Sequence, residues 1–276
     1  MDIELEELIR RRDELALLDV RSDGEYTGAA GYPCDPRQGH IPGARHVDWR
    51  SELTEAPTDE DAGMLRLGGP QRVAAAFARA GLRDGASVVV YDDTLSLYAA
   101  WVWWCLRVYG LESTRILDGG YPRWVGARRP VSTASLPHPE GSFTPRPNPR
   151  LRLATSDIRA ILGSPDVQIL DARPAAEYRG FEGNARRLGH IPGAINVPVG
   201  AMHEPGQQGL RQPDWLRADV VAANVARGRR LVCYDGSGVG AAKLAFVLTL
   251  LGFDDVAVYD GGWSDWGDRL DLPVER

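Results

Sequence analysis

The feature that most constrains the fold of this chain is an internal repeat of four short motifs. Each motif occurs once in either half of the sequence, in the same order, with copies about 142 to 152 residues apart. The pairs are LLDVR at 17–21 with ILDAR at 169–173, GHIPGA at 39–44 with GHIPGA at 189–194, VVVYD at 88–92 with LVCYD at 231–235, and LDGGY at 117–121 with YDGGW at 259–263. Ordered repetition with uneven spacing is expected of duplicated domains that differ in loop length.

A proline-rich stretch separates the two copies. Residues 131–150 contain five prolines, which favour extended or polyproline II backbone and exclude a packed helix. We therefore expect an N-terminal domain over residues 1–130, a linker over 131–150 and a C-terminal domain over 151–276.

Short apolar runs and amphipathic segments alternate within each copy. The runs predict buried strands at 15–20, 87–91, 115–117, 167–171, 231–234 and 256–259, and the amphipathic segments include helices at 70–80, 97–109 and 240–251. This alternation predicts an α/β fold in which each domain is a mainly parallel sheet flanked by helices on both faces. Ligands of such sheets bind beyond the carboxyl ends of the strands, so the strand-to-helix turns are the places to search.

The composition excludes several classes of function. A net charge of −6 and a pI near 5.5 argue against nucleic acid or an anionic membrane as partner. The apolar run 98–105 is far shorter than the roughly 20 residues that cross a bilayer. The N-terminus resembles neither a signal peptide nor a transit peptide, so we expect a cytoplasmic protein. Three scattered cysteines provide neither a disulfide framework nor zinc-ligand spacing, and we expect no metal.

One turn has the composition of an anion site. The strand at 231–234 is followed directly by DGSGVG at 235–240, and a helix is expected to begin close behind it. Three glycines in six residues let successive N–H groups point inward, and the positive end of the helix dipole adds to their field. A thiolate, persulfide, sulfonate or phosphate would be favoured there. The same spacing is also typical of a tight turn that merely needs glycine.

Taken together, these motifs resemble those of the tandem rhodaneses, the thiosulfate and 3-mercaptopyruvate sulfurtransferases. The resemblance extends over about residues 5–272. It implies two rhodanese-like domains, of which the first is catalytically silent and the second carries a six-residue loop of the type CGSGVT that begins with the nucleophilic cysteine. It also implies a small anionic sulfur compound, such as thiosulfate or 3-mercaptopyruvate, as substrate, and no cofactor. In this chain Asp235 stands at the cysteine and Gly240 at the threonine.

Asp235 limits how much of the family's chemistry can be expected. Family chemistry needs a thiolate that attacks a sulfane sulfur and holds it as a persulfide, which a carboxylate cannot do. The negative charge of Asp235 would also repel an incoming dianion, by on the order of a few kcal/mol at about 4 Å. One hypothesis is a sulfurtransferase-family enzyme of doubtful persulfide chemistry. Others are a non-catalytic module that binds an anion or a partner, or an altered residue at a position that is cysteine in the source of the chain.

The candidate site therefore consists of Asp235 at the nucleophile position and a set of substrate-binding residues. These are Gly236, Ser237, Gly238, Val239, Gly240, Arg173 and Arg179. The two arginines follow the strand 167–171 and would suit a sulfonate or carboxylate, or else pair with surface acids. Glu177 stands where the family often has a substrate-binding arginine. His40 and His190 recur in both copies and are expected to be structural.

The remaining candidates are expected to be silent. Cys233 lies two residues before Asp235 on the same strand and is interpreted as a buried structural thiol, as is Cys105 on the helix 97–109. Cys34 lies in an irregular loop with no expected base beside it. The turn at 92–96 in the first copy lacks glycine, so we expect it not to form an amide nest of the kind predicted at 235–240.

Overall fold

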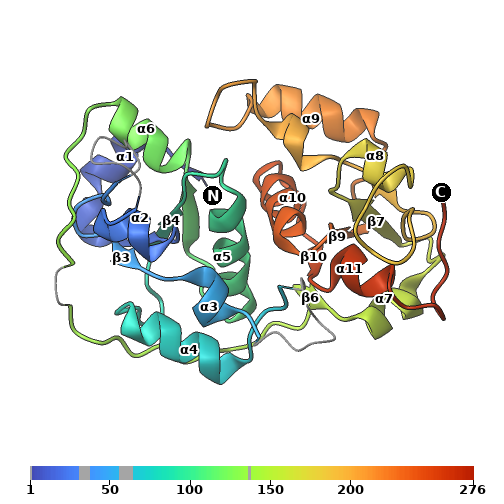
Figure 1. Ribbon diagram of the computed structural model, residues 1–276, viewed down its shortest axis with the longest axis horizontal. Coiled ribbons are helices and arrows are strands. Elements are labelled where there is room, and N and C mark those ends of the chain that lie inside the picture. The colour runs from blue at the N-terminus through green and yellow to red at the C-terminus, as the bar shows by residue number, and fades with distance from the viewer. Residues whose placement is uncertain (1, 31–37, 56–64, 136–137) are drawn as a thin grey trace. The chain divides into compact units, whose positions relative to one another are not determined.

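The computed structural model describes residues 2–30, 38–55, 65–135 and 138–276 (Figure 1). The chain forms two compact units. The first comprises Met1–Thr54, Gly68–Asn148 and His203–Leu210, and the second comprises Glu55–Leu67, Pro149–Met202 and Arg211–Arg276. Each unit therefore consists mainly of one half of the sequence and includes one short segment from the other half.

The first unit is built around a parallel sheet with strand order β1-β5-β4-β2-β3 among its described residues. Its elements are β1 (Asp2–Ile3), α1 (Leu5–Arg10), η1 (Arg12–Glu14), β2 (Ala16–Asp19), α2 (Asp23–Thr27), β3 (Arg45–His46), α3 (Trp49–Leu53), α4 (Pro70–Arg79), β4 (Val88–Tyr91), α5 (Leu97–Val108), β5 (Thr114–Leu117) and α6 (Gly120–Gly126). All four residues of β4 are buried, as expected of a central strand covered on both faces.

The second unit repeats this topology with strand order β6-β10-β9-β7-β8, again all parallel. Its elements are β6 (Arg152–Leu153), α7 (Thr155–Ile161), β7 (Val167–Asp171), α8 (Ala175–Tyr178), β8 (Ile195–Asn196), η2 (Val199–Met202), α9 (Pro213–Ala222), β9 (Arg230–Tyr234), α10 (Val239–Leu250), β10 (Val256–Tyr259) and α11 (Gly262–Trp266). The register also repeats, because Asp19 pairs with Tyr91 and Asp171 pairs with Tyr234. The predicted fold class is confirmed.

The repeated LD-x-R motif forms a buried network in each unit. In the first, Arg21 Nη2 donates to Asp19 at 2.6 Å and to the carbonyl of Gly39 at 2.6 Å. Tyr91 Oη donates at 2.7 Å to Asp19 Oδ2, the oxygen that also accepts from Arg21 Nη2, and accepts the N–H of Ile41. The motifs LLDVR, GHIPGA and VVVYD therefore meet in one place, which explains why they recur as a set.

The same contacts occur in the second unit. Arg173 Nη2 lies 2.6 Å from Asp171 and 2.8 Å from the carbonyl of Gly189, and Tyr234 Oη accepts the N–H of Ile191 at 3.1 Å. In each unit the buried aspartate forms an ion pair with the arginine and accepts a hydrogen bond from the tyrosine. These contacts pair polar side chains that could not be left unpaired in a core.

The two repeated histidines hold the chain beside this network. His40 Nδ1 lies 2.8 Å from the carbonyl oxygen of Tyr26, and the two rings stack at 3.9 Å. His190 and Tyr178 make the same pair, at 2.8 Å and 3.8 Å. Their contacts are structural, as the sequence predicted.

The proline-rich stretch packs on the first unit. Phe143 is buried, the N–H of Asp84 donates to the carbonyl of Ser142, and the N–H of Arg146 donates to the carbonyl of Tyr109 at 2.9 Å. No helix forms among residues 131–135 and 138–150. The segment is extended, as expected of its prolines, and the first unit continues through it to Asn148. None of the helices in the described ranges is long and apolar enough to span a bilayer.

Candidate active-site loop

The loop at residues 235–240 connects the carboxyl end of β9 to the first turn of α10 (Figure 1). Strand β9 lies between β7 and β10, so the loop emerges at the centre of the sheet edge where ligands of parallel sheets bind. Gly238 is the N-cap of α10 and has φ 96°, a conformation that L side chains rarely adopt. The glycine at this position is therefore required by the turn.

The backbone N–H groups of the loop converge on the side chain of Asp235. The N–H of Ser237 lies 3.2 Å from Asp235 Oδ1, Gly238 donates to the same oxygen, and the N–H of Gly240 lies 2.9 Å from Oδ2. We call these three donors the amide cradle. The predicted cradle is present, and the carboxylate of the chain itself occupies it.

Burial and hydrogen bonding act on Asp235 in opposite directions. Desolvation raises the pKa of its carboxyl group, and the N–H groups of Gly240, Gly238 and Ala241 oppose that rise. Asp171 adds a smaller repulsion. Each donor stabilises the ionised form, so the cradle supports a negative charge that is already in place.

A second carboxyl group, that of Glu177, lies close enough to Asp235 for the two charges to interact. The pKa of Glu177, on α8, is raised by desolvation and further by the charges of Asp171, Glu182 and Asp235, while Arg173 lowers it. The surroundings of the loop are therefore acidic, at a position where the family resemblance implies an arginine. An anionic ligand would meet repulsion there.

The DGGW motif at residues 260–263 contacts the backbone of the loop. Gly262 has φ 60°, and a Cβ atom at this position would lie 2.6 Å from the carbonyl oxygen of Asp235. The N–H of Trp263 donates to that oxygen at 2.7 Å, and the N–H of Ser264 donates to the carbonyl of Gly236 at 3.0 Å. The repeated double glycine thus allows two backbone segments to approach closely.

The rhodanese-like domain is the family whose model matches this sequence, over residues 3–127 and 154–269. The chain belongs to the rhodanese family. It is 35% identical over 266 residues to the 3-mercaptopyruvate sulfurtransferase of Escherichia coli K12, covering 95% of this chain and 92% of that protein. It is 34% identical over 280 residues to the putative thiosulfate sulfurtransferase SseB of Mycobacterium tuberculosis H37Rv, covering 99% and 95%.

Comparison with solved structures agrees with this assignment. The crystal structure of SseA from Escherichia coli, described as a 3-mercaptopyruvate sulfotransferase with the rhodanese fold, is similar with a TM-score of 0.80 and 29% sequence identity. The similarity covers 95% of this chain and 98% of that chain. Both rhodanese-like domains are therefore present, and the relatives support a sulfurtransferase-like function that acts on small sulfur compounds.

The first rhodanese-like domain has a nest that the sequence did not reveal. Asp92, the counterpart of Asp235, accepts the N–H groups of Thr94 and Ser96 on Oδ1 and those of Tyr98 and Ala99 on Oδ2, at 2.8–3.1 Å. The expectation that a turn without glycine forms no nest is wrong. Leu95 and Ser96 adopt positive φ values of 54° and 58° and provide the curvature instead.

A signal for this nest was available in the sequence. In both copies an aspartate directly follows the strand a few residues before a helix, and its side-chain oxygens can accept the free N–H groups of the turn and of the first helical residues. The repeated aspartate was the better predictor of the nest, and the glycines were secondary.

The two candidate arginines differ in position. Arg173 is buried, with its guanidinium bonded to Asp171 and lying 4.7 Å from the ring centre of Trp263. Its remaining nitrogen, Nη1, is 3.8 Å from Glu177 Oε2. These contacts hold the guanidinium of Arg173 in place, and its contact with substrate stays a prediction. Arg179 is exposed at the end of α8.

No cysteine among the described residues presents an exposed thiol. Cys233 is completely buried on β9, and burial raises the pKa of its thiol far above the ordinary value, so that the reactive thiolate is disfavoured. Cys105 is buried on α5. Cys34 lies outside the described residues. Within the described ranges, no group of three or more potential metal ligands forms.

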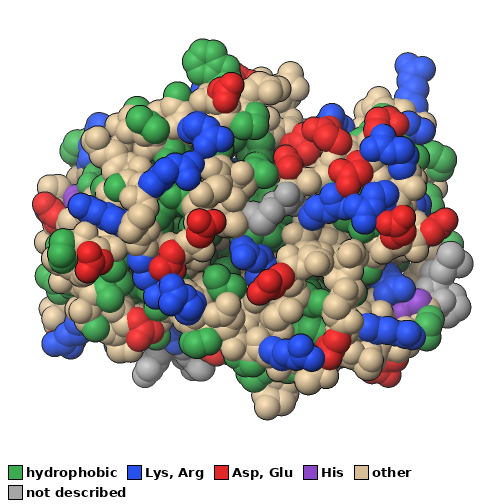
Figure 2. Space-filling model, turned by 180° about the vertical axis from the view of Figure 1, so that it is seen from behind, with side chains coloured by type: hydrophobic (Ala, Val, Ile, Leu, Met, Phe, Trp, Pro, Cys, Tyr) green, Lys and Arg blue, Asp and Glu red, His purple; other side chains and the backbone are tan. Residues whose placement is uncertain are grey.

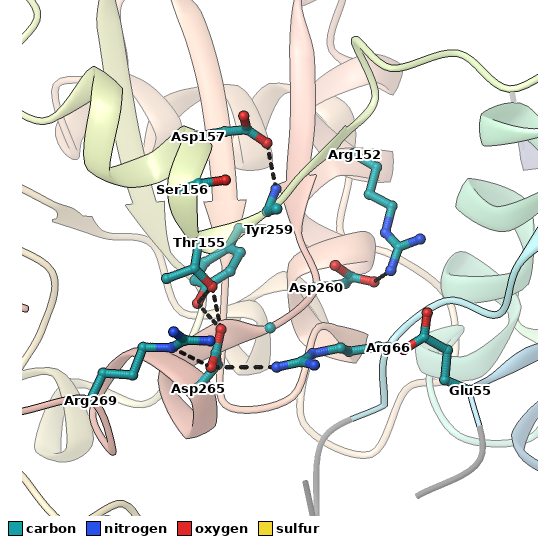
Figure 3. A pocket seen from close by; sticks show the side chains of 12 residues that line it. Glu55, Arg66, Arg152, Thr155, Ser156, Asp157, Tyr259, Asp260, Asp265 and Arg269 are labelled. Carbon is teal, nitrogen blue, oxygen red and sulfur yellow. Dashed lines mark hydrogen bonds and ion pairs between the residues drawn. The ribbon is translucent and has the colours of Figure 1, made fainter. Parts of the chain in front are cut away.

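A cavity of about 600 Å³ lies beside the loop in the second unit (Figure 3). Its charged side chains neutralise one another, since Arg152 lies 2.9 Å from Asp260, and Arg269 and Arg66 lie 2.8 Å and 3.4 Å from Asp265. None of residues 235–240 lines this cavity. These charged side chains form ion pairs with one another, and the lining of the cavity contains no evident reactive group.

The face shown in Figure 2 has Lys and Arg side chains interspersed with Asp and Glu side chains. No broad patch of one sign is visible on this face. A surface of this kind lacks the continuous basic area that binds a phosphate backbone.

Proposed function

We propose that this chain is a sulfurtransferase-like member of the rhodanese family that does not form the persulfide intermediate and instead uses the scaffold as a binding module. The observation that carries this proposal is the carboxylate of Asp235, which accepts the N–H groups of Ser237, Gly238 and Gly240.

The chemistry of sulfur transfer explains why this substitution matters. A thiolate attacks the outer sulfur of the donor, a new S–S bond forms, and the rest of the donor leaves with the electron pair of the broken bond. Carboxylate oxygen is a weak nucleophile towards sulfur, and any adduct would be an acyl-sulfur species instead of a persulfide. The loop at residues 235–240 therefore lacks a group that can carry the sulfur between donor and acceptor.

The same geometry opposes binding of a free anion at the cradle. The donors that would hold thiosulfate or a sulfonate are bonded to Asp235, and Glu177 adds a second negative charge nearby. A dianion about 4 Å from one such charge would be disfavoured by on the order of a few kcal/mol. Of the two non-catalytic roles considered from the sequence, binding of a partner by the scaffold is therefore favoured over capture of a small anion.

A second candidate is sulfur transfer that persists without the usual nucleophile. Its support is the similarity of almost the whole chain to 3-mercaptopyruvate and putative thiosulfate sulfurtransferases. Thiosulfate and 3-mercaptopyruvate are accordingly the donors with which the proposal should be tested.

A turnover assay distinguishes the two candidates. The native chain, Asp235→Cys and Asp235→Ser are compared for cyanide-dependent turnover of each donor. We expect no turnover above background for the native chain and for Asp235→Ser, and measurable turnover for Asp235→Cys, because the cradle lowers the pKa of the new thiol. Turnover by the native chain that survives Cys233→Ser and Cys34→Ser would refute the proposal.

A further inference from the structure

Gly240 occupies a position where the side chain of Asp235 leaves no room for another. It is the second residue of α10, and a Cβ atom built there would lie 2.9 Å from Asp235 Oδ2. Separations below 3.0 Å essentially never occur for real Cβ atoms. Its φ is not among the positive values, so the backbone itself does not require glycine. The requirement comes from the carboxylate.

The carboxylate cannot easily move aside. Its Oδ1 accepts the N–H groups of Ser237 and Gly238, and its Oδ2 accepts the N–H of Gly240. The main chain of Asp235 is fixed as well, because its carbonyl accepts the N–H of Trp263 at 2.7 Å. A side chain at residue 240 would therefore break hydrogen bonds of the cradle.

The first unit provides an internal comparison. Tyr98 is the second residue of α5, as Gly240 is of α10, and its N–H likewise donates to an aspartate Oδ2, that of Asp92, at 2.8 Å. Four residues lie between Asp92 and the start of α5, whereas three lie between Asp235 and the start of α10. The longer turn admits a large side chain at this position. Glycine is needed only in the shorter loop.

We propose that Gly240 determines which side chain residue 235 can place in the cradle, so that Asp235 and Gly240 form a matched pair. The contact below 3.0 Å is with Oδ2, an atom that cysteine lacks, while the Cγ and Cβ atoms of Asp235 would lie at 3.3 and 3.4 Å. The loop is thus fitted to a carboxylate. Cysteine at residue 235 would remove the contact below 3.0 Å and so relax the requirement for glycine at residue 240. This inference rests on the proposed function, which it extends to a positioning residue.

A stability cycle tests the pairing without any activity. Gly240→Ala is made in the native chain, in Asp235→Ala and in Asp235→Cys, and the Tm is measured. Alanine is the better helix former, so without the carboxylate we expect Gly240→Ala to leave the Tm unchanged or to raise it. In the native chain we expect the Tm to fall by about 2–4 °C, the shift that about 1 kcal/mol produces in a chain of similar size.

Gly236→Ala is the matched control in the same loop. A Cβ at residue 236 meets nothing within 4 Å and its φ is not positive, so its effect on the Tm should be the same in all three backgrounds. Equal shifts from Gly240→Ala with and without the carboxylate would overturn the proposal. The cycle reads only stability, so it remains informative even if the native chain proves to transfer sulfur.

A second measurement addresses chemistry. Asp235→Cys and the double variant Asp235→Cys/Gly240→Thr are compared for turnover of 3-mercaptopyruvate. We expect the double variant to be faster by on the order of tenfold, because correctly placed cradle donors contribute at least that much to rate. Asp235→Cys/Gly126→Ala should show no such gain, because Gly126 lies in α6 with nothing within 4 Å of an added Cβ. A double variant that is no faster than Asp235→Cys would contradict the matched pair.

Discussion

At the scale of the residue, the nests around Asp92 and Asp235 show that an aspartate carboxylate can occupy a set of backbone N–H groups suited to an anion. Asp92 and Asp235 each accept several backbone N–H groups at the start of a helix. Such bonds offset the burial that raises the pKa of both carboxyl groups. Both domains therefore contain such a nest, and an aspartate carboxylate of the chain occupies each one.

A neighbouring carboxyl group makes a pH dependence testable. Burial and a hydrogen bond with Glu25 raise the pKa of Asp93 to about 6, above the value of about 3.9 in an unfolded chain. As the pH falls through 6, the folded protein binds a proton that the unfolded chain does not yet bind, so this group adds stability on acidification from pH 7 to pH 4.

Asp93→Asn should remove that contribution. We expect the native chain to gain stability relative to Asp93→Asn between pH 7 and pH 4, by less than the full shift of Asp93 allows, because Asp93 is partly exposed and the lowered pKa of Glu25 acts in the opposite direction. Urea unfolding at a series of pH values measures it. Parallel pH profiles for the two proteins would contradict the assignment.

At the scale of the element, the DGGY and DGGW motifs connect the start of a helix to the loop of the same domain that contains Asp92 or Asp235. A Cβ at Gly262 would lie 2.6 Å from the carbonyl oxygen of Asp235, and one at Gly120 would lie 2.2 Å from that of Asp92. Both glycines have positive φ. The repeat thus reflects the same backbone contact made twice.

Gly262→Ala should destabilise the protein by about 2 kcal/mol or more, since the new methyl group strains a positive φ and clashes with backbone. Gly126→Ala is the control, because Gly126 lies in α6 with ordinary φ and nothing within 4 Å of an added Cβ. There alanine should be neutral or stabilising by up to about 1 kcal/mol. Urea unfolding measures both variants, and equal effects would show that the close approach is unimportant.

At the scale of the whole molecule, the sequence predicted the duplication, the parallel sheets and the position of the loop, because periodic apolar runs and repeated motifs are local signals. It did not predict that Glu55–Leu67 belongs to the second unit and His203–Leu210 to the first. The anchors of these segments are long-range hydrogen bonds, from the N–H of Leu67 to Asp260 and from that of Leu210 to Asp118. Hydrogen bonds between residues so far apart in the sequence produce no periodic pattern from which they could be predicted.

The candidate site, like the fold, was predicted only in part. The amide cradle of Ser237, Gly238 and Gly240 was expected from a glycine-rich turn, whereas the nest around Asp92 was not, because Leu95 and Ser96 adopt a conformation that their residue types rarely take. Arg173 was expected either to bind substrate or to pair with a surface acid, and only the fold shows that its partner is the buried Asp171. Charge on a residue says little about which partner it meets.

The most direct test of the account is the mass of the intact protein after incubation with thiosulfate or 3-mercaptopyruvate and removal of the free donor. A persulfide adds the mass of one sulfur atom to the chain. We predict that the native chain keeps its original mass, because Asp235 cannot accept sulfur and Cys233 is buried, and that Asp235→Cys gains one sulfur that cyanide removes. A native chain that gains a cyanide-labile sulfur would contradict the central claim.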